Sequence, residues 1–485
     1  MTISAISKSR VNYLILSLAM LMVCGYWFSQ ITGSQIKADA AQNLRMAINL
    51  EHRGVMSRDN SPPFKPSMYR EPLPVWLAAL GVKAVDAFLG PAHAKSYFEG
   101  NRARYLKYQN ILWIAVLSAG TFWACFILTS SVYASLFAAL LLNPRLPMTP
   151  SGMFEMRIDS LNNELLAASL LIFASALLVM SVKHGRLRHA VIAGLLLGLL
   201  ALTKAVTVYV SLILFLLLLC LLALPQRLLP HRFRWQQLIV LFLAFSLVLL
   251  PWIYRNYTQF GSLQVAERGG IVLYTRAIKN QMTPDEYLGS FYAYAPGLRS
   301  MIGRVLGFSK SDLQIGGRLQ RLNRNVSRER DHAAEEAGDP DGAISYFYSA
   351  RAMRMKMQHD LALRGVPNKN VEADKFLRER AVAMISAHPI KHFAMTLPFI
   401  WRGGFTSFVI LSACLIWAVV RRRPELGVFV LLGFGTIMFY AIFSHFIPRY
   451  SVSITPVTIV SGVVLLTIML NFIKKHIGER LTGAG

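Results

Sequence analysis

The chain has 485 residues, of which 54% are hydrophobic and 16% are charged. Its apolar residues lie in blocks of about 20, the length of helix that crosses a bilayer core, so a soluble protein is excluded as a description of the whole chain. The formal net charge of +26 would suit nucleic acid, but no basic-aromatic module or zinc-finger spacing is present, and we expect no nucleic-acid partner.

Ten apolar stretches predict an all-α polytopic membrane protein of about 10 transmembrane helices, within a range of about 8 to 12. The stretches are residues 11–31, 109–129, 131–143, 161–181, 189–203, 205–224, 236–252, 404–420, 426–444 and 451–473. The first is too long for a signal peptide and is expected to remain as a span. The third is short enough to be half of a bent hairpin.

Short connections rich in Lys and Arg mark the cytoplasmic side of a membrane protein. Such connections lie at residues 183–188, 227–234, 421–423 and 474–475. Both termini are therefore predicted to be cytoplasmic, in a multi-pass protein of the plasma membrane, the inner membrane of a bacterium. The chain then divides into a transmembrane catalytic module at 1–252, whose first outer loop is 32–108, an external and mostly helical segment at 253–403, and C-terminal transmembrane helices with a cytoplasmic tail at 404–485.

The first outer loop begins with apolar residues at helical spacing, among them Leu44 and Ala47, and Gly54 is a typical helix stop. This pattern predicts an amphipathic helix that lies on the membrane surface. Asp39 stands just after the first span, where a carboxylate can accept a proton. Because Gln42 follows three residues later, Asp39 also fits an N-terminal capping pair, and the two roles can coexist.

Arg70 is surrounded by prolines at positions 66, 72 and 74. These prolines predict extended backbone immediately before a moderately apolar interfacial helix that ends near Leu89. A guanidinium in this place can clamp a lipid phosphate with two parallel hydrogen bonds, a geometry that Lys cannot match. The alternative partners of Arg70 are Glu71 and a lipid headgroup.

A third outer turn, at residues 153–160, carries charged and polar residues at the mouth of the fourth span, and Glu164 follows on its first helical turn. Such groups are costly at that depth unless they face a water-filled cavity. Asp159 either joins Asp39 in a pair of carboxylates, one a base and one an orienting group, or caps the helix, as Ser160 also could. Lys204, between the fifth and sixth spans, is a candidate for a further phosphate contact.

The rest of the chain favours an enzyme over an ion-coupled transporter. Ionisable residues are almost absent from the spans, apart from Glu164, whereas such transporters hold them near the midplane. The external segment is predicted to be helical at 316–336, 344–363 and 371–387, and to cover the outer cavity and select the acceptor, or to serve as a structural lid.

The four cysteines lie in apolar stretches, so no disulfide or metal motif is indicated. No cofactor is certain, and a divalent metal is possible but not indicated.

Several short motifs follow one another in a fixed order. They are the Asp after the first span, A-x-N-L-x-x-x-G at 47–54, R-E-P-L-P at 70–74, R-I-D at 157–159, L-T-K at 202–204, P-W-x-x-R-N at 251–256, H-P at 388–389 and P-R-Y at 448–450 with Pro456. In this order and placement they resemble the GT-C glycosyltransferase superfamily, in particular the branch that contains protein O-mannosyltransferases and the lipid A aminoarabinose transferase. The resemblance covers most of residues 1–275 and 385–470.

The resemblance implies a donor sugar linked to a polyprenyl phosphate, such as undecaprenyl phosphate. It implies inverting transfer at the outer face of the membrane to a lipid, glycan or protein acceptor of the cell envelope, with membrane lipids around the site. The alternatives are a transporter or flippase of lipid-linked saccharides and a non-catalytic subunit of an envelope complex.

The predicted site combines these positions with that resemblance. The catalytic candidates are Asp39 and Asp159. The donor-phosphate candidates are Arg70, Lys204 and Arg255, and the secondary candidates are Arg157, Glu71 and Arg449. Asp39 is followed by Ala40 where many relatives carry a second acidic residue, which leaves a metal at the site in doubt.

Overall fold

The protein is an all-α polytopic membrane protein. The computed structural model describes residues 17, 18, 20–142, 158–223 and 233–482, with side chains as far as 474, and all regular structure in these ranges is helical. Within these ranges, eight helical segments are long and apolar enough to cross a membrane. They are 72–89, 100–129, 164–184, 206–223, 235–260, 389–420, 424–443 and 448–474.

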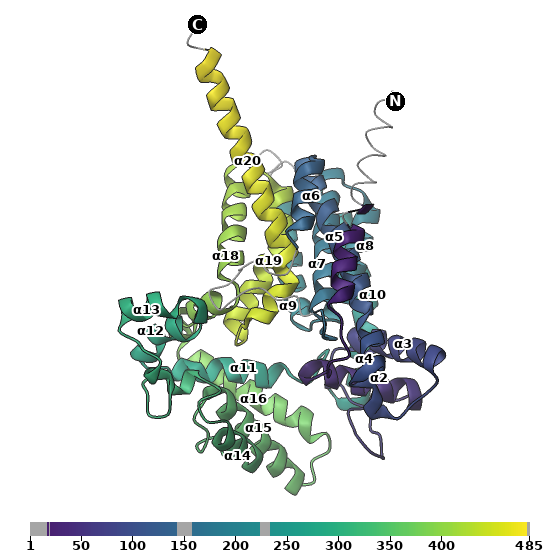
Figure 1. Ribbon diagram of the computed structural model, residues 1–485, viewed down its shortest axis with the longest axis vertical. Coiled ribbons are helices and arrows are strands. Elements are labelled where there is room, and N and C mark those ends of the chain that lie inside the picture. The colour runs from purple at the N-terminus through teal and green to yellow at the C-terminus, as the bar shows by residue number, and fades with distance from the viewer. Residues whose placement is uncertain (1–16, 19, 143–157, 224–232, 483–485) are drawn as a thin grey trace.

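The helices of the bundle run roughly parallel to its long axis (Figure 1). They are α5 (Gln109–Thr129), α6 (Val132–Leu140), α7 (Glu164–His184), α8 (Leu187–Ala201), α9 (Val206–Ala223), α10 (Trp235–Phe260), α18 (Thr396–Val420), α19 (Pro424–Phe443) and α20 (Thr455–Thr482). A shorter apolar helix, Met20–Ser29, precedes them. The stretch at 236–252, predicted as a span, lies within α10, which continues as one helix to Phe260.

Eight candidate spans among the described residues lie within the predicted range of about 8 to 12, and the count of about ten is not confirmed. The stretches at 131–143 and 189–203 form α6, of 9 residues, and α8, of 15 residues, both shorter than the roughly 20 residues that a bilayer core requires. Conversely, α3 (Pro72–Leu89), predicted as an interfacial helix, is apolar and long enough to meet the criterion for a span. Figure 1 shows α3 beside α2 and α4 at one end of the bundle.

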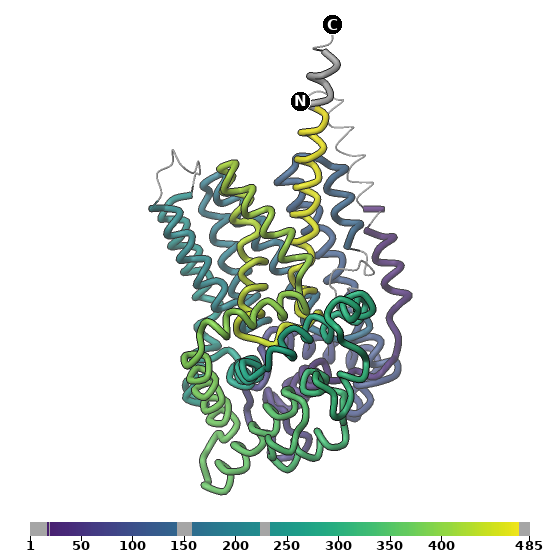
Figure 2. The backbone as a smooth tube through the Cα atoms, turned by 90° about the vertical axis from the view of Figure 1, so that its left-hand side faces the viewer, coloured from purple at the N-terminus to yellow at the C-terminus, as the bar shows by residue number. Residues whose placement is uncertain are grey.

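The remaining helices gather at that same end, and we call residues 38–107 and 269–387 the cap. The cap contains α2 (Ala38–Arg53), α3, η1 (Ala94–Tyr97), α4 (Gly100–Lys107), α11 (Gly269–Ala277), η2 (Ile278–Gln281), α12 (Pro284–Ala293), η3 (Pro296–Leu298), α13 (Arg299–Leu306), η4 (Ser311–Leu313), η5 (Gln320–Leu322), α14 (Arg328–Ala337), α15 (Tyr346–Leu363) and α16 (Lys369–Ala387). Two further elements, α17 (Pro389–Ala394) and η6 (Pro448–Ile454), join the cap to the bundle. Figure 2 shows both parts of the cap, purple-blue and green, below the bundle.

The bundle packs closely where small residues allow two helix backbones to approach. Gly194 and Gly198, one turn apart in α8, face α10. A methyl group on Gly194 would overlap the carbonyl oxygen of Leu241, and one on Gly198 would lie 2.6 Å from the Cβ of Val248. These glycines therefore set the distance between α8 and α10, and α7 packs on the same helix α8.

The cap has its own apolar cores. On α2, Leu44, Ala47 and Ile48 are buried, as their helical spacing predicts, and Gly54 ends the helix with φ of 69°. Leu44 and Ile48 pack with residues of α3 and α4. In the other part of the cap, the Asp374 carboxylate of α16 accepts hydrogen bonds from the first backbone N–H groups of α11, at 2.7 and 2.9 Å, and so satisfies donors that an isolated helix end leaves free.

The predicted helices at 344–363 and 371–387 are confirmed as α15 and α16. The helix predicted at 316–336 is wrong over its first half, where turns and η5 precede α14. Gly316 has φ of 81°, which breaks a helix. The Asp312 carboxylate also binds the side chain of Arg318 and the backbone of Ser309, which stabilises a compact turn instead.

Candidate functional site

Four segments that are distant in sequence meet where the cap joins the bundle. Asp39 lies in the first turn of α2, Arg70 immediately before α3, Arg268 immediately before α11, and Arg449 in η6 between α19 and α20. Successive bundle helices alternate in direction, so the chain returns to this end at the start of α7, between α8 and α9, and between α19 and α20. The topology therefore brings these loop residues together.

Three arginines surround the carboxylate of Asp39. Arg70 and Arg268 donate to Oδ1 at 3.0 and 3.1 Å, and Arg449 donates to Oδ2 at 2.6 Å. The Nε of Arg70 also donates to Oδ1 of Asn43 at 2.8 Å. The Arg70 side chain is 6% exposed and that of Asp39 is 25% exposed, so the cluster is largely enclosed but open to solvent at the carboxylate.

The N-terminal capping role considered for Asp39 is wrong. The cap residue of α2 is Lys37, and no side chain caps the helix. Burial alone would raise the pKa of the Asp39 carboxyl, but the charges of Arg70 and Arg268 and the hydrogen bond from Arg449 outweigh it and hold the pKa far below its ordinary value. While these arginines hold it, Asp39 is therefore a stable anion and a weak base.

The cluster extends into the bundle through Glu164, at the start of α7. The Glu164 carboxylate, 3% exposed, pairs with Lys204 at 3.0 Å and with Arg449 at 3.2 Å. The connected set thus has four cations, Arg70, Lys204, Arg268 and Arg449, against two carboxylates. The ion-paired residues thus carry two more positive than negative charges, and the nearby Glu71 carboxylate, which also acts on Arg268, offsets part of this surplus.

Asp159 belongs to a different network. Its Oδ1 accepts from Lys107 Nζ and from the backbone N–H of Thr32, both at 2.8 Å, and its Oδ2 accepts from the hydroxyls of Thr32 and Ser34 at 2.5 and 2.6 Å. The Lys107 side chain is fully buried. Burial would raise the pKa of Asp159, but the hydrogen bonds from Lys107, Ser34 and Thr32 lower it. Asp39 and Asp159 share no partner among the described residues.

The other predicted residues have mixed positions. Lys204 and Arg449 belong to the Asp39 network, as described above. Arg255 stacks on Trp252, with its guanidinium carbon 4.5 Å from the ring centre, and donates to Oδ1 of Asn256 at 2.8 Å. No contact joins it to Asp39 within the described chain.

The remaining predicted residues that the structure describes make no contact of the expected kind. Glu71 is the cap residue of α3 and makes no side-chain cap bond. Neither Asp159 nor Ser160 caps α7, whose cap residue is Asn163, and Arg157 lies outside the described residues.

Two members of the site, Arg268 and Asn43, were not among the residues predicted from the sequence. Arg268 follows a segment with no matching motif, and nothing in its spacing connects it with Asp39, 229 residues earlier. Asn43 falls one turn after Asp39 on α2, the same face of a helix, so that spacing is the one signal that would have found it.

The chemistry of this site suits an anion. Among the described residues, no group of three or more His, Cys, Asp or Glu side chains is placed to hold a metal ion. The side chains that converge on Asp39 are guanidiniums, which bind phosphate and carboxylate through paired N–H donors. The site can therefore accept an anionic group and leave a carboxylate beside it.

Comparisons with known proteins give likenesses in structure only. No protein-family model and no curated protein matches the sequence. The chain is similar to the archaeal oligosaccharyltransferase AglB from Archaeoglobus fulgidus, solved with an inhibitory peptide and a dolichol-phosphate, at 13% identity and a TM-score of 0.47, over 99% of this chain and 52% of that one. It thus spans about half the length of that structure.

A second likeness is to ArnT from Cupriavidus metallidurans in the apo state, at 10% identity and a TM-score of 0.38, over 94% of this chain and 78% of that one. With TM-scores below 0.5, neither assigns a substrate or a residue role to this chain.

Proposed function

We propose that this protein is a membrane glycosyltransferase that moves a sugar from a polyprenyl-phosphate donor to an acceptor. The observation that carries the proposal is the set of three arginines that converge on Asp39 at one end of a membrane-spanning bundle. A lipid-linked phosphate lies at that depth when its chain is in the bilayer. The motif resemblance described above supports the same reaction.

The arginines are the proposed phosphate ligands. In the donor the phosphate is a diester with one negative charge, and when the bond from the sugar C1 to the phosphate oxygen breaks, the released polyprenyl phosphate gains a second one. The surplus of positive charge in the network favours this more negative state over the donor. Such stabilisation of developing charge by fixed donors accelerates the reaction.

Asp39 is the proposed base. A new bond forms between the acceptor oxygen and the sugar C1, and the acceptor proton passes to the carboxylate. While the arginines hold it, Asp39 is a weak base. A bound phosphate competes for the same guanidiniums, so its arrival raises the pKa of Asp39 and activates the base only when donor is present.

Asp159 is proposed to hold the site together rather than to act in the chemistry. Its partners Thr32 and Ser34 lie between the first apolar helix and α2, and Lys107 ends α4. This network ties the chain that enters the cap to the turn before α7. Arg255, predicted as a phosphate ligand, is likewise proposed to fix the end of α10 through Trp252 and Asn256.

The proposed location of the site is the outer face of the membrane. The basic connections at 183–188 and 421–423 lie at the opposite end of the bundle from the cap, because α7, α8, α18 and α19 meet there. Short basic loops face the cytoplasm, which would place the cap, and Asp39 with it, outside. The proposed acceptor is a lipid, glycan or protein of the cell envelope.

The test is the release of polyprenyl phosphate. The purified protein in nanodiscs is incubated with polyprenyl-phosphate sugars and an extract of envelope lipids and glycans as acceptor. We expect sugar-dependent release of polyprenyl phosphate by the parental protein and far less by the Arg70→Ala variant. Translocation of intact donor without cleavage would instead identify a flippase. If the protein neither releases polyprenyl phosphate nor translocates donor, the alternative of a non-catalytic envelope subunit remains.

A further inference from the structure

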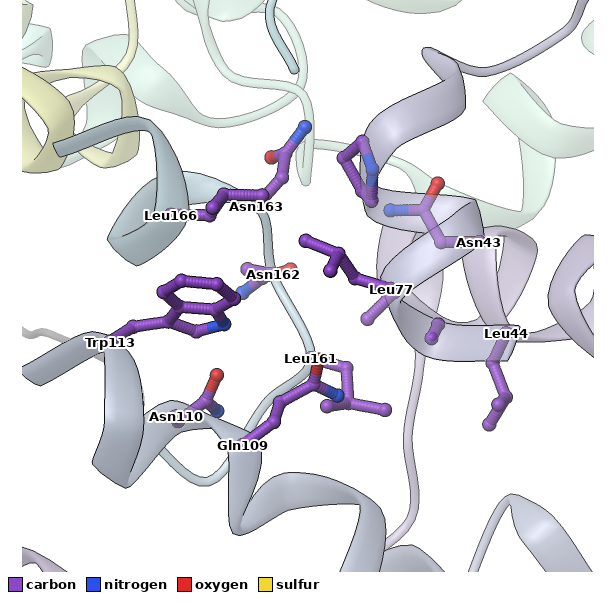
Figure 3. Close-up of a pocket in the computed structure, with 13 residues that line it drawn as sticks. Asn43, Leu44, Leu77, Gln109, Asn110, Trp113, Leu161, Asn162, Asn163 and Leu166 are labelled. Atoms are coloured by element: carbon purple, nitrogen blue, oxygen red, sulfur yellow. The ribbon is translucent and has the colours of Figure 1, made fainter. Parts of the chain in front are cut away.

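A groove lined by amide side chains opens beside the Asp39 cluster. It lies between α2 and α3 on one side and α5 and the turn before α7 on the other (Figure 3). Its enclosed part is small, about 30 Å³, and the rest of the space between its walls is open to solvent. Thirteen residues line it and none of them is ionisable; those that carry polar groups are Asn43, Gln109, Asn110, Trp113, Asn162 and Asn163.

The groove begins at the proposed catalytic residues. Asn43 follows Asp39 by one helical turn on the same face of α2, and its Oδ1 is bound by Arg70. That bond fixes the amide and leaves its Nδ2 without a partner among the described residues. Asn43 is 4% exposed, and Figure 3 shows it on the wall opposite Trp113.

The facing wall offers acceptors that are fixed in the same way. The Nδ2 of Asn110 donates to two backbone carbonyls of the turn before α7, at 2.7 and 3.0 Å, and the Nδ2 of Asn163 donates to the carbonyl of Thr203 at 3.0 Å. The Oδ1 atoms of both amides have no partner within the described chain. Asn110 and Asn163 are 2% and 8% exposed, so two buried side chains each leave one polar atom free.

Two further groups complete the lining. The amide of Asn162 and the indole N–H of Trp113 have no hydrogen-bond partner among the residues that the structure describes, and both lie beside Asn110 on one wall (Figure 3). Both residues are partly exposed, so a ligand in the groove can reach their polar groups and satisfy them. The groove therefore presents donors, acceptors and an aromatic ring, all of them uncharged.

This composition suits a ring with several hydroxyl groups. A hydroxyl both donates and accepts, so it can satisfy the free Nδ2 of Asn43 and the free Oδ1 of Asn110 or Asn163. A charged sugar is disfavoured, because no lining residue carries the opposite charge to offset its desolvation.

We propose that the groove binds the sugar ring of the donor and selects an uncharged, hydroxyl-bearing sugar. The proposal rests on the proposed function, and it adds the class of sugar. Arg70 links the two parts of the site: its Nη1 faces the carboxylate beside the phosphate position and its Nε holds the first amide of the groove.

The first test needs no variant. The parental protein is given three donors with the same polyprenyl phosphate, carrying mannose, the cationic 4-amino-4-deoxyarabinose, or the anionic glucuronic acid, and release of polyprenyl phosphate is followed. We expect kcat/KM to be at least about tenfold higher for the neutral sugar. Equal or faster release from a charged donor would overturn the inference while the proposed function stands, and release from none of the three would overturn both.

The second test places a charge in the groove. Asn162→Asp keeps the size of the side chain and adds a carboxylate, and Asn101→Asp makes the same change on an exposed residue of α4. We expect the ratio of kcat/KM for the cationic donor to that for the neutral donor to rise about tenfold in Asn162→Asp and to stay parental in Asn101→Asp. An unchanged ratio in a folded Asn162→Asp protein would mean that the sugar does not contact this groove.

Discussion

Asp39 and Asp159 are carboxylates of the same end of the bundle, yet their partners differ in kind. Asp39 is held by long guanidinium side chains from segments that lie 31, 229 and 410 residues away. Asp159 is held by a fully buried lysine and by short groups of the 32–34 turn. Arg268 and Arg449, 34% and 23% exposed, can turn to another anion while Arg70 stays buried. The partners of Asp159 cannot move unless the entry of the chain into the cap moves with them.

The difference separates a carboxylate that can act in catalysis, Asp39, from one that holds the structure together, Asp159. A carboxylate whose partners are exchangeable cations can be released by a competing phosphate. A carboxylate bound by a buried charge and a backbone N–H is a fixed structural contact, because a buried pair that loses one partner leaves an uncompensated charge. On this comparison, substitution of Asp39 should affect turnover, and substitution of Asp159 should affect stability.

The largest effect is expected from Asp39→Asn. Asparagine keeps the size of the side chain but cannot take the acceptor proton, and general-base catalysis typically contributes about 10²–10⁴-fold. We expect sugar transfer to fall by at least about 100-fold with donor binding retained, measured by polyprenyl phosphate release and by donor titration. Asp312→Asn, at the ion pair with the half-exposed Arg318 of the cap, is the control; near-parental turnover of Asp39→Asn would remove the base from this position.

Asp159→Asn should instead lower the free energy of unfolding. The change leaves the buried Lys107 ammonium without its counter-ion. Because Asp159 is 29% exposed and water reaches the pair, we expect a loss of about 1–3 kcal/mol. Thermal denaturation of the detergent-solubilised protein is the measurement, and the Lys107→Met, Asp159→Asn double variant should recover part of the loss. A stable Asp159→Asn protein with collapsed turnover would make Asp159 the base.

Arg70→Ala should weaken donor use by roughly 10- to 150-fold, because a charge-assisted contact contributes about 1.5–3 kcal/mol. Arg70→Lys should recover part of this only, since one ammonium cannot reach both Asp39 and Asn43 as the guanidinium does. The KM for donor and kcat are measured for both variants. Parental values in both would leave Arg70 as an anchor of α3 with no role toward phosphate.

The pH dependence should differ between the free protein and the donor complex. Because the folded-state pKa of Asp39 is lowered, its stabilising contribution is present above its unfolded pKa of about 3.9 and is lost as the pH falls through the folded pKa. The acid limb of kcat/KM, which reports the free protein, should therefore lie below about pH 4. The acid limb of kcat should lie at least about one unit higher, and coincident limbs would show that donor does not take the arginines from Asp39.

Single cysteines test the side of the membrane and should leave activity unchanged. Asn60→Cys and Asn325→Cys are at exposed positions of the cap, and His184→Cys is at the exposed end of α7. In intact cells an impermeant thiol reagent should label the first two and not the third. The reverse pattern would place the cap, and Asp39 with it, in the cytoplasm.

Much of the architecture is determined locally, by the sequence itself. Apolar stretches of bilayer length predicted most of the long helices, the basic connections predicted which ends lie together, and apolar spacing predicted the buried face of α2, because hydropathy and helical periodicity depend on neighbouring residues. Local patterns also identified Asp39 and Arg70, which the structure joins directly.

Only the tertiary structure decided which charges meet. Arg268 and Arg449 reach Asp39 because loops separated by hundreds of residues close on one end of the bundle, and the same packing gave Asp159 a buried lysine and two hydroxyls instead of a second carboxylate. An ion pair requires a separation of about 4 Å. No sequence pattern specifies that distance across 410 residues, since it is fixed by how all the intervening helices pack.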